Sequence, residues 1–216
     1  MSLWTTRTLI ERALQLTGGE AGDLYNVELW KIMLNQGQDN MLASSRAFQK
    51  TVEYTYTIQS NFSEPSDFLD FAKEPPLFRN ISGETMTLKP VSRTQLYEYD
   101  SYYRDADNTN YPTHIRTDDF YVHPQPLSEG TLILPYTYRP YYLSEDNDIP
   151  FGGNSRYVRF AEGLSYFVAN SVLMPINPAL AGAMWNVYKE RRGEMKEMAR
   201  ETAQTDNYVR TLANRR

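Results

Sequence analysis

The chain has 216 residues, of which 41% are hydrophobic and 23% are charged, a composition typical of a globular protein. It contains no cysteine, which excludes a disulfide framework, thiol catalysis and a thiolate metal site. Lys and Arg number 22 against 27 Asp and Glu, and the resulting net charge of −5 disfavours a general nucleic-acid binder. Without a long apolar run or a signal-peptide pattern at its start, we expect a soluble, intracellular protein.

Two helices are predicted in the first fifty residues. The first, over residues 3–17, has apolar side chains at helical spacing and stops at Gly18-Gly19. The second follows Asp23, a suitable N-cap residue. Its apolar stripe consists of Val27, Trp30, Met33, Leu34 and Met41. The polar residues of this helix that we expect to face solvent include Lys31, Gln38 and Asp39.

At Lys50 the spacing of apolar residues changes from the helical period to strict alternation. This alternation predicts a half-buried strand that continues to Ile58. A second, short strand is predicted at residues 85–91. The run Ser92–Gln95 has the spacing of a capping box, which predicts a short helix that carries Leu96.

The stretch 97–111 is rich in Tyr, Asp and Asn, which indicates a loop. After it, two apolar segments at 120–123 and 131–139 are predicted to pair as a hairpin with a long turn. The chain contains 17 tyrosines, and packing on strands is their simplest explanation, with subunit contacts or sugar-binding platforms as alternatives.

The helical period returns at residues 155–174, which predicts a helix with a wide apolar face at the centre of the core. Its expected core residues are Phe160, Leu164 and Phe167. Asn177 is the predicted N-cap of the last helix, with Pro178 at its first position. Beyond Lys189 this helix is mostly charged, so we expect it to leave the body of the domain there.

Helices at both ends with strands between them predict an α+β fold. The helical bundle is built from both chain ends, and it carries a β-rich insertion of antiparallel strands and an extended C-terminal helix. The expected divisions are 1–49 and 151–203 for the helical domain, 50–150 for the insertion, and 204–216 for a C-terminal tail.

Three groups of polar residues are candidates for chemistry. They are His114 and His123 near Asp118 and Asp119, the acidic run Glu145–Asp148, and the carboxylates Asp67, Asp70 and Glu74. The histidines lack the spacing of a zinc helix, and the carboxylates have no known separation. The acidic run is followed by Pro150, and the glycine and terminal glutamate of a calcium loop are misplaced. No phosphate-binding loop or nucleophile elbow occurs. We therefore predict no enzymatic activity, and no catalytic, cofactor-binding or metal-binding residues.

Five features occur along the chain in a fixed order. They are a strand at 54–58 leading to Pro65-Ser-Asp-Phe-Leu69, Tyr111–Ile115, Phe120–Pro126, Leu132–Pro140, and Asp148-Ile-Pro150 running into the helix at 155–174. This order resembles the adaptor, or head-to-tail connector, proteins of tailed bacteriophages, the group that includes tail tubular protein A. The two opening helices fit the usual start of that family, so the resemblance covers nearly the whole chain. The stretch 97–111 has no counterpart in the family.

The resemblance implies a structural virion protein at the head–tail junction, present in the host cytoplasm during assembly, with no cofactor. Members of the family form a ring, usually dodecameric, between the portal protein and a tail or nozzle protein. Genomic double-stranded DNA passes through the lumen of such a ring, and the net negative charge suits passage without specific binding. The alternatives are another phage stopper or tail-completion protein, and a tyrosine-rich carbohydrate-binding module.

In the family that this chain resembles, the C-terminal segment typically reaches the portal. Here Gly193 weakens the last helix, so residues 189–216 are predicted to be partly disordered in the isolated monomer. The last residues then combine apolar anchors four positions apart with surrounding cations, a pattern typical of a short amphipathic helix. The residues predicted to bind the portal are Tyr208, Arg210, Leu212, Arg215 and Arg216. An ordinary frayed terminus is the alternative.

Overall fold

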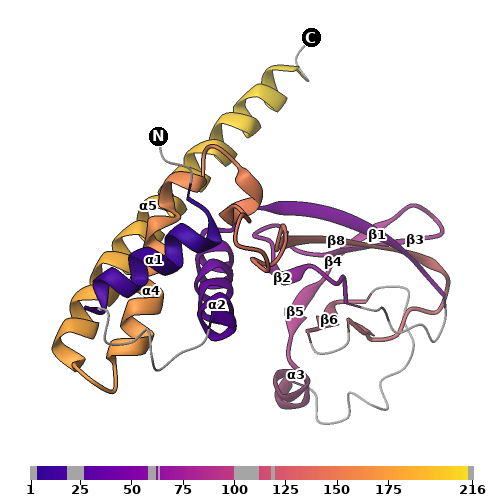
Figure 1. Cartoon of the computed structure of the whole chain (residues 1–216). Coiled ribbons are helices and arrows are strands. Elements are labelled where there is room, and N and C mark those ends of the chain that lie inside the picture. Colours follow the sequence, from indigo (N-terminus) through magenta and orange to yellow (C-terminus); the bar gives the residue numbers. More distant parts are fainter. Residues whose placement is uncertain are drawn as a thin grey trace. The chain divides into compact units, whose positions relative to one another are not determined.

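The structure is a computed structural model with an α+β fold, as predicted (Figure 1). It describes residues 4–18, 27–57, 62, 64–99, 112–117 and 120–213, with the side chains of Tyr99 and 203–213 left out. The chain divides into two compact units. The helical unit comprises Met1–Phe48 and Arg139–Arg216, and the strand unit comprises Gln49–Tyr138.

The helical unit is a bundle built from both chain ends. Its helices are α1 (Thr6–Leu16), α2 (Val27–Ser45), α4 (Glu162–Leu173) and α5 (Pro178–Ala213), with the short 3-10 turns η2 (Pro150–Gly153) and η3 (Val158–Phe160). Helix α4 is central because it packs against α1, α2 and α5. Its buried apolar side chains are Leu164, Val168, Ala169, Val172 and Leu173.

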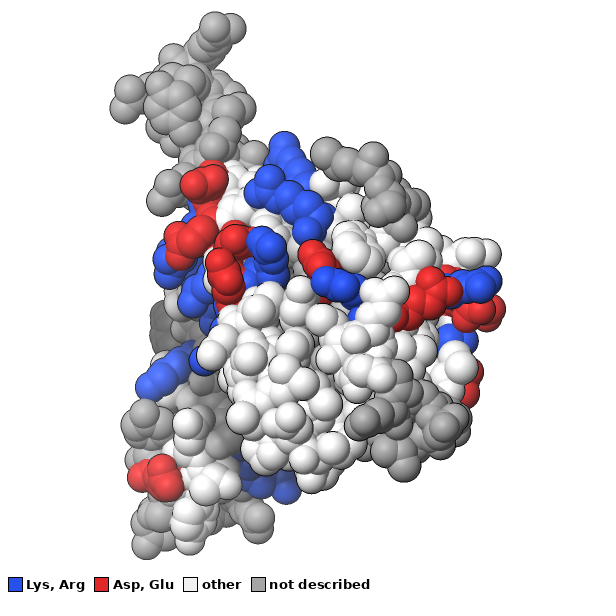
Figure 2. Space-filling model, turned by 60° about the vertical axis from the view of Figure 1, so that its left-hand side comes forward, with Lys and Arg blue, Asp and Glu red and all other residues white. Residues whose placement is uncertain are grey.

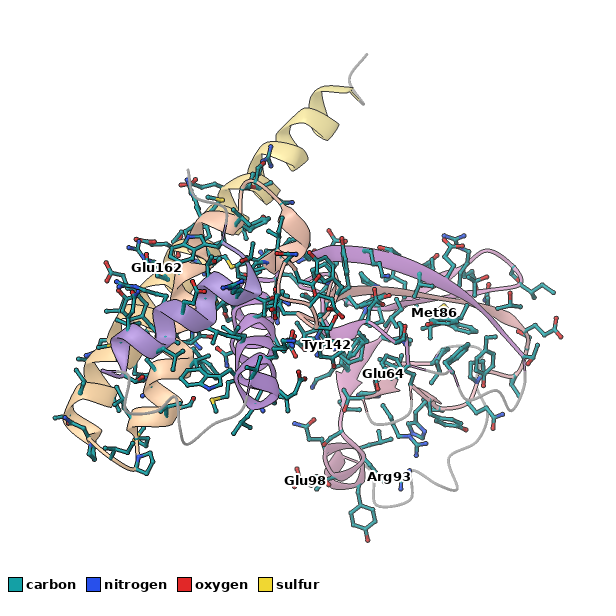
Figure 3. The ribbon with its side chains drawn as sticks, viewed as in Figure 1. Glu64, Met86, Arg93, Glu98, Tyr142 and Glu162 are labelled. Carbon is teal, nitrogen blue, oxygen red and sulfur yellow. The ribbon has the colours of Figure 1, made fainter. Side chains whose placement is uncertain are left out.

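The central helix is shorter than predicted. Residues 155–161 contain the turn η3, and the α-helix itself begins only at Glu162, labelled in Figure 3. Phe160 and Leu164 are buried as predicted, but Phe167 is only half-buried. Its ring lies 5.0 Å from that of Tyr188, between α2 and α5 rather than deep in the core.

Glycine allows α2 and α4 to approach closely. A Cβ atom at Gly37 of α2 would lie 3.0 Å from the Phe167 ring, and one at Gly163 of α4 would lie 3.1 Å from Met41. Gly37 comes before Met41 in α2, but its partner Phe167 comes after Gly163 in α4. The two helices are therefore antiparallel.

The last helix begins as predicted but leaves the body of its unit later than predicted. The side chain of Asn177 accepts a hydrogen bond from the N–H of Leu180 (3.1 Å), and Pro178 is the first residue of α5. Met195 and Ala199 are buried, so α5 packs on its own unit well beyond Lys189. The prediction that α5 leaves the body of its unit at Lys189 was wrong, because buried residues continue at helical spacing among the charged ones.

Two amide side chains of α2 hold the segment that follows the last strand. Asn35 donates to the carbonyl of Leu143 (3.1 Å) and accepts from its N–H (2.8 Å). Gln38 donates to the carbonyl of Tyr141 (3.2 Å) and accepts from the N–H of Phe151 (2.8 Å). These bonds satisfy backbone N–H and C=O groups of an irregular segment that is not paired in a sheet. They explain why residues 139–150 belong to the helical unit.

The three polar residues of α2 that were predicted to face solvent are therefore covered to a large extent, contrary to the prediction. Gln38 is fully buried, and the side chain of Lys31 is 13% exposed and lies 3.7 Å from Asp146. Asp39 forms a bidentate ion pair with Arg139, with an Nε–Oδ1 distance of 2.6 Å. Polar side chains tolerate burial when they are hydrogen-bonded, and here the partners come from residues about a hundred positions away.

The strand unit contains two sheets. The larger has the order β1-β8-β3-β4, with β2 also paired to β8, and every pair is antiparallel. Its strands are β1 (Gln49–Tyr56), β2 (Phe68–Phe71), β3 (Leu77–Asn80), β4 (Thr85–Thr87) and β8 (Gly130–Tyr138). The smaller sheet, β5-β6-β7, consists of β5 (Lys89–Val91), β6 (His114–Arg116) and β7 (Val122–His123).

The core of this unit lies on one face of the larger sheet. Even-numbered side chains of β1 and β8 point into it, together with side chains of the smaller sheet. Its fully or nearly fully buried members are Tyr56, Phe62, Phe78, Leu88, Ile115, Phe120, Val122, Leu132, Leu134 and Tyr136. The tyrosines of β1 and β8 are therefore packing residues, which is the simplest of the explanations considered for the tyrosine content.

Two strand predictions were wrong. The segment 85–91 is not one strand, because β4 ends at Thr87 and β5 begins in the other sheet at Lys89. The segments at 120–123 and 131–139 do not form a hairpin, because β7 pairs with β6 whereas β8 pairs with β1, β2 and β3. Pro124 and Pro126 lie between them, and neither has an N–H to donate to a ladder.

The predicted capping box is confirmed at α3 (Arg93–Tyr99). Ser92 Oγ accepts from the N–H of Gln95 (3.1 Å), and Gln95 Oε1 accepts from the N–H of Ser92 (3.0 Å). Leu96 is buried, as predicted. The predicted N-cap Asp23 and most of the loop at 97–111 lie outside the described residues.

Candidate functional site

The C-terminal part of α5 is the first candidate site. Figure 1 shows its yellow end continuing away from the other helices of the helical unit. Tyr208, Arg210 and Leu212 are in this part of the helix, but their side chains lie outside the described part of the chain. Arg215 and Arg216 lie outside the described residues altogether. The five predicted portal-binding residues thus remain a prediction.

The last described turns before that segment carry charges of both signs. Arg191 pairs with Glu194 and Arg200 pairs with Glu197, each at 2.9 Å. Figure 2 shows acidic and basic residues intermixed over the upper part of the visible face. Because these ion pairs are exposed, each contributes less than about 1 kcal/mol to stability, and they leave no strong field of one sign.

Two hollows flank the same turns of α5. One, of about 470 Å³, is lined by Ala47, Asn154, Ser155, Arg156, Tyr157 and Thr202. The other, of about 430 Å³, is lined by Arg159, Phe160, Arg191 and Glu194. Both combine a few apolar atoms with polar and charged side chains, and neither contains a nucleophile paired with a base.

The strand unit contains a cluster of ionisable side chains at Lys50, Asp67 and Tyr136. Lys50 Nζ lies 2.5 Å from Asp67 Oδ2, and the Tyr136 hydroxyl donates to Asp67 Oδ1 (2.9 Å). Partial burial raises the pKa of Asp67, but the hydrogen bonds from Lys50 and Tyr136 outweigh it and hold that pKa below its ordinary value. The hydrogen bond to Asp67 raises the pKa of Lys50. The cluster joins β1, β8 and the turn before β2.

Two of the three predicted carboxylates are engaged in other contacts. Asp67 is an ion-pair partner, and Asp70 accepts a hydrogen bond from the backbone N–H of Phe71 (2.8 Å). A glycosidase needs one carboxyl group with a raised pKa, and Asp67 shows the opposite shift.

The model of the SU10 adaptor protein family matches residues 4–215. The chain belongs to this family. It is a structural adaptor protein of a phage, and hence a component of the virion, which confirms the predicted family resemblance at that level. No curated protein matches the chain. Within the described ranges, none of the helices has both the length and the apolar character needed to cross a membrane.

In the adaptor, the two histidines are cross-strand partners in the β6–β7 pair. His114 is opposite His123 in the register, and His123 is buried. Burial lowers the pKa of His114, with a smaller contribution from Lys89. Asp118 and Asp119 lie outside the described residues. Among the residues that the structure describes, no cluster of three or more His, Asp or Glu side chains is arranged to hold a metal ion.

The acidic run of the adaptor caps a helix. The carbonyl oxygens of Asp148 and Asp146 accept hydrogen bonds from the N–H groups of Thr6 (2.9 Å) and Arg7 (3.0 Å) at the start of α1. The Asp148 carboxylate accepts from the N–H of Glu145 (2.8 Å), which lowers the pKa of Asp148. Sequence reasoning missed this role because the two segments are far apart in the chain.

Proposed function

We propose that this adaptor assembles into a ring, dodecameric as in the connectors that the sequence resembles, which joins the phage portal to the tail or nozzle protein. Genomic double-stranded DNA passes through the lumen. Membership of the adaptor family supports this proposal, and so does the net charge of −5, since a ring of acidic subunits repels the phosphate backbone. The kinship with tail tubular protein A belongs to the same proposal.

The observation that carries the proposal is the length of α5. The helix has buried residues as far as Ala199 and then continues to Ala213. An isolated helical end of this kind gains little from its own propensity, so its stability depends on packing against something else. In the proposed complex that partner is the portal, with Tyr208 and Leu212 as apolar anchors. Arg210, Arg215 and Arg216 then pair with acidic portal groups.

Deletion of residues 204–216 tests portal docking. We expect a truncated adaptor with an unchanged melting temperature that no longer binds purified portal rings and yields tail-less or leaking particles in an assembly reaction. The double variant Tyr208→Ser/Leu212→Ser should show the same loss. Val209→Ser is the matched control, because it makes a similar polar change on a different side of the helix.

The outcomes separate the alternatives. If the truncated adaptor binds portal at the wild-type level, the docking proposal is contradicted, and the segment 204–216 is an ordinary frayed terminus. Binding to tail proteins without any binding to portal would instead indicate a stopper or tail-completion protein.

A further inference from the structure

Within the described residues, the larger sheet of the strand unit has open edges at β1, at β4 and at the short strand β2. Strand β1 is at one end of the order β1-β8-β3-β4 and β4 is at the other (Figure 1). β1 is paired to β8 along its entire length, from Gln49 opposite Thr137 to Tyr56 opposite Gly130. Its other side has no partner strand within the described residues. Such an edge presents a row of backbone donors and acceptors that can pair with another strand.

The register shows which residues of β1 present these groups. The carbonyl of Pro135 in β8 accepts from the N–H of Ala72 (3.2 Å), so the backbone of Pro135 faces the side of β2 and not that of β1. Its partner across the β1–β8 pair is Thr51. Backbone direction alternates along an antiparallel pair, so Thr51, Glu53 and Thr55 all direct their N–H and C=O groups away from β8.

The same analysis applies to β4. Asn80 N–H donates to the Glu84 carbonyl (2.9 Å), and Leu88 N–H donates to the Pro76 carbonyl (2.8 Å). Even-numbered residues therefore make the bonds between these two segments. Alternation then directs the backbone groups of Thr85 and Thr87 outward. Across the described part of the chain, neither these two residues nor Thr51, Glu53 and Thr55 form a backbone hydrogen bond to a further segment.

The side chains at these outward positions are compatible with pairing. Thr51, Glu53, Thr55, Thr85 and Thr87 are all exposed, and the pairing register places them on the same face of the sheet, opposite the core. Four of the five are threonine, which favours strands and forms good cross-strand pairs. Met86, between the last two and labelled in Figure 3, packs on the core side instead.

The β1 edge carries little of the usual protection against pairing, whereas β4 is itself a short edge of three residues. Natural edge strands are commonly guarded by proline, a bulge or an outward lysine. β1 contains no proline, and its single lysine, Lys50, is held by Asp67 and lies over the rings of Tyr136 (5.4 Å) and Tyr138 (5.0 Å). An eight-residue edge without these features is expected to be covered by another chain in the assembled state.

We propose that the β1 edge of one adaptor pairs with the β4 edge of the next copy, so that the larger sheet continues from subunit to subunit. This proposal rests on the proposed ring. Cyclic assembly of identical chains needs two different surfaces that complement each other, and the two edges of one sheet meet that requirement. Pairing of two β1 edges about a two-fold axis would instead bring two Glu53 side chains onto the same face, where like charges repel.

Cysteine cross-linking tests this contact, because the native chain contains no cysteine. One set of single variants carries Thr51→Cys, Glu53→Cys or Thr55→Cys, and the other carries Thr85→Cys or Thr87→Cys. After oxidation of the full-length protein, a mixture of one variant from each set should give a disulfide-linked dimer in at least one combination. The corresponding double variant should give a ladder of larger oligomers. Each single variant alone should stay monomeric in denaturing gels.

Native mass spectrometry of the reduced variants distinguishes the possible failures. Rings without cross-links in any combination would overturn the edge contact and leave the ring intact. Cross-linked dimers of Thr51→Cys or Glu53→Cys alone would indicate pairing of two β1 edges, which also overturns the proposal. A wild-type chain that stays monomeric, with and without the portal, would contradict both the ring and the edge contact.

A second pair of variants tests the backbone directly. Thr51→Pro removes an outward N–H without removing a bond to β8, whereas Thr51→Val keeps that N–H. We expect Thr51→Pro to reduce the ring population at least tenfold while its circular dichroism spectrum stays unchanged, and Thr51→Val to assemble like the wild type. Equal assembly of a folded Thr51→Pro variant would overturn the proposal.

Discussion

At the scale of single residues, the Asp67 cluster links stability to pH. The folded state holds the pKa of Asp67 below its unfolded value, so the stabilisation is fully present above the unfolded pKa of about 4 and is lost as the pH falls through the folded pKa. The side chains of Lys50 and Asp67 are 44% and 29% exposed, which limits the contribution to about 1 kcal/mol or less.

We therefore expect Asp67→Asn to lower the free energy of unfolding by up to about 1 kcal/mol at pH 7 and to have little effect near pH 3. Urea denaturation at the two pH values measures this difference. Asp70→Asn is the control, since that carboxylate bonds to a neighbouring backbone N–H and not to a cation. A destabilisation by Asp67→Asn that is equally large at both pH values would show that the charge is not responsible.

Individual residues also show which features a sequence reveals. The capping box at Ser92 and Gln95 was predictable because both partners are within four positions. The burial of Gln38 was not predictable, because its partners Tyr141 and Phe151 are more than a hundred positions away. The helical period marks Gln38 as polar, but it carries no information about a distant backbone that needs hydrogen bonds.

At the scale of elements, the glycines of the helices differ in what surrounds them. A Cβ atom at Gly193 of α5 would meet no atom within 4 Å, whereas one at Gly37 of α2 would lie 3.0 Å from the Phe167 ring. Gly193→Ala should raise the free energy of unfolding by about 1 kcal/mol through helix propensity and a less flexible unfolded chain. Gly37→Ala should lower it, because α2 and α4 must move apart.

Thermal denaturation of the two variants measures both effects, and Gly182→Ala is a matched control because its Cβ also meets nothing within 4 Å. A lower melting temperature for Gly193→Ala would indicate that these turns of α5 are not helical in solution.

Strand pairing was harder to predict than strand location. Alternation correctly located β1 and β8, yet it gave no information about which strands pair. The consecutive strands β7 and β8 belong to different sheets, and the smaller sheet depends on a parallel pair, β5 with β6, that no turn signal marks. Non-local pairing of this kind is set by the core shared between sheets rather than by local turn residues.

At the scale of the whole molecule, the sequence revealed two kinds of structure because the period of its apolar residues changes near residue 50. The location of the second change was less visible. Residues 139–150 have no regular period, and their place in the helical unit depends on Asn35, Gln38 and Asp39 of α2. The C-terminal candidate site could be inferred only from the family resemblance and the pattern of anchors and cations.

The strand unit begins and ends at neighbouring points, which makes the two units separable by design. The unit begins at Gln49 and ends at Tyr138. Gln49 is opposite Thr137 in the β1–β8 pair, so the two ends of the insertion are about 5 Å apart. Among its described residues, ten form a buried core of the unit's own. We expect a fragment of residues 49–138 to fold alone, and a chain in which two glycines replace this segment to keep the helical fold.

Circular dichroism and thermal denaturation test both expectations. The fragment should give a strand-type spectrum and the shortened chain a helical one, each with a cooperative transition. Phe78→Ala removes a buried ring from the strand unit and should destabilise the fragment by about 3–5 kcal/mol. The shortened chain lacks residue 78, and its transition should match that of the helical unit in the full-length protein. An unfolded fragment would mean that the strand core needs the helical unit to form, and would contradict the division. If the sheet edges form the ring contact, the shortened adaptor should still bind portal through α5 but should fail to form rings by itself.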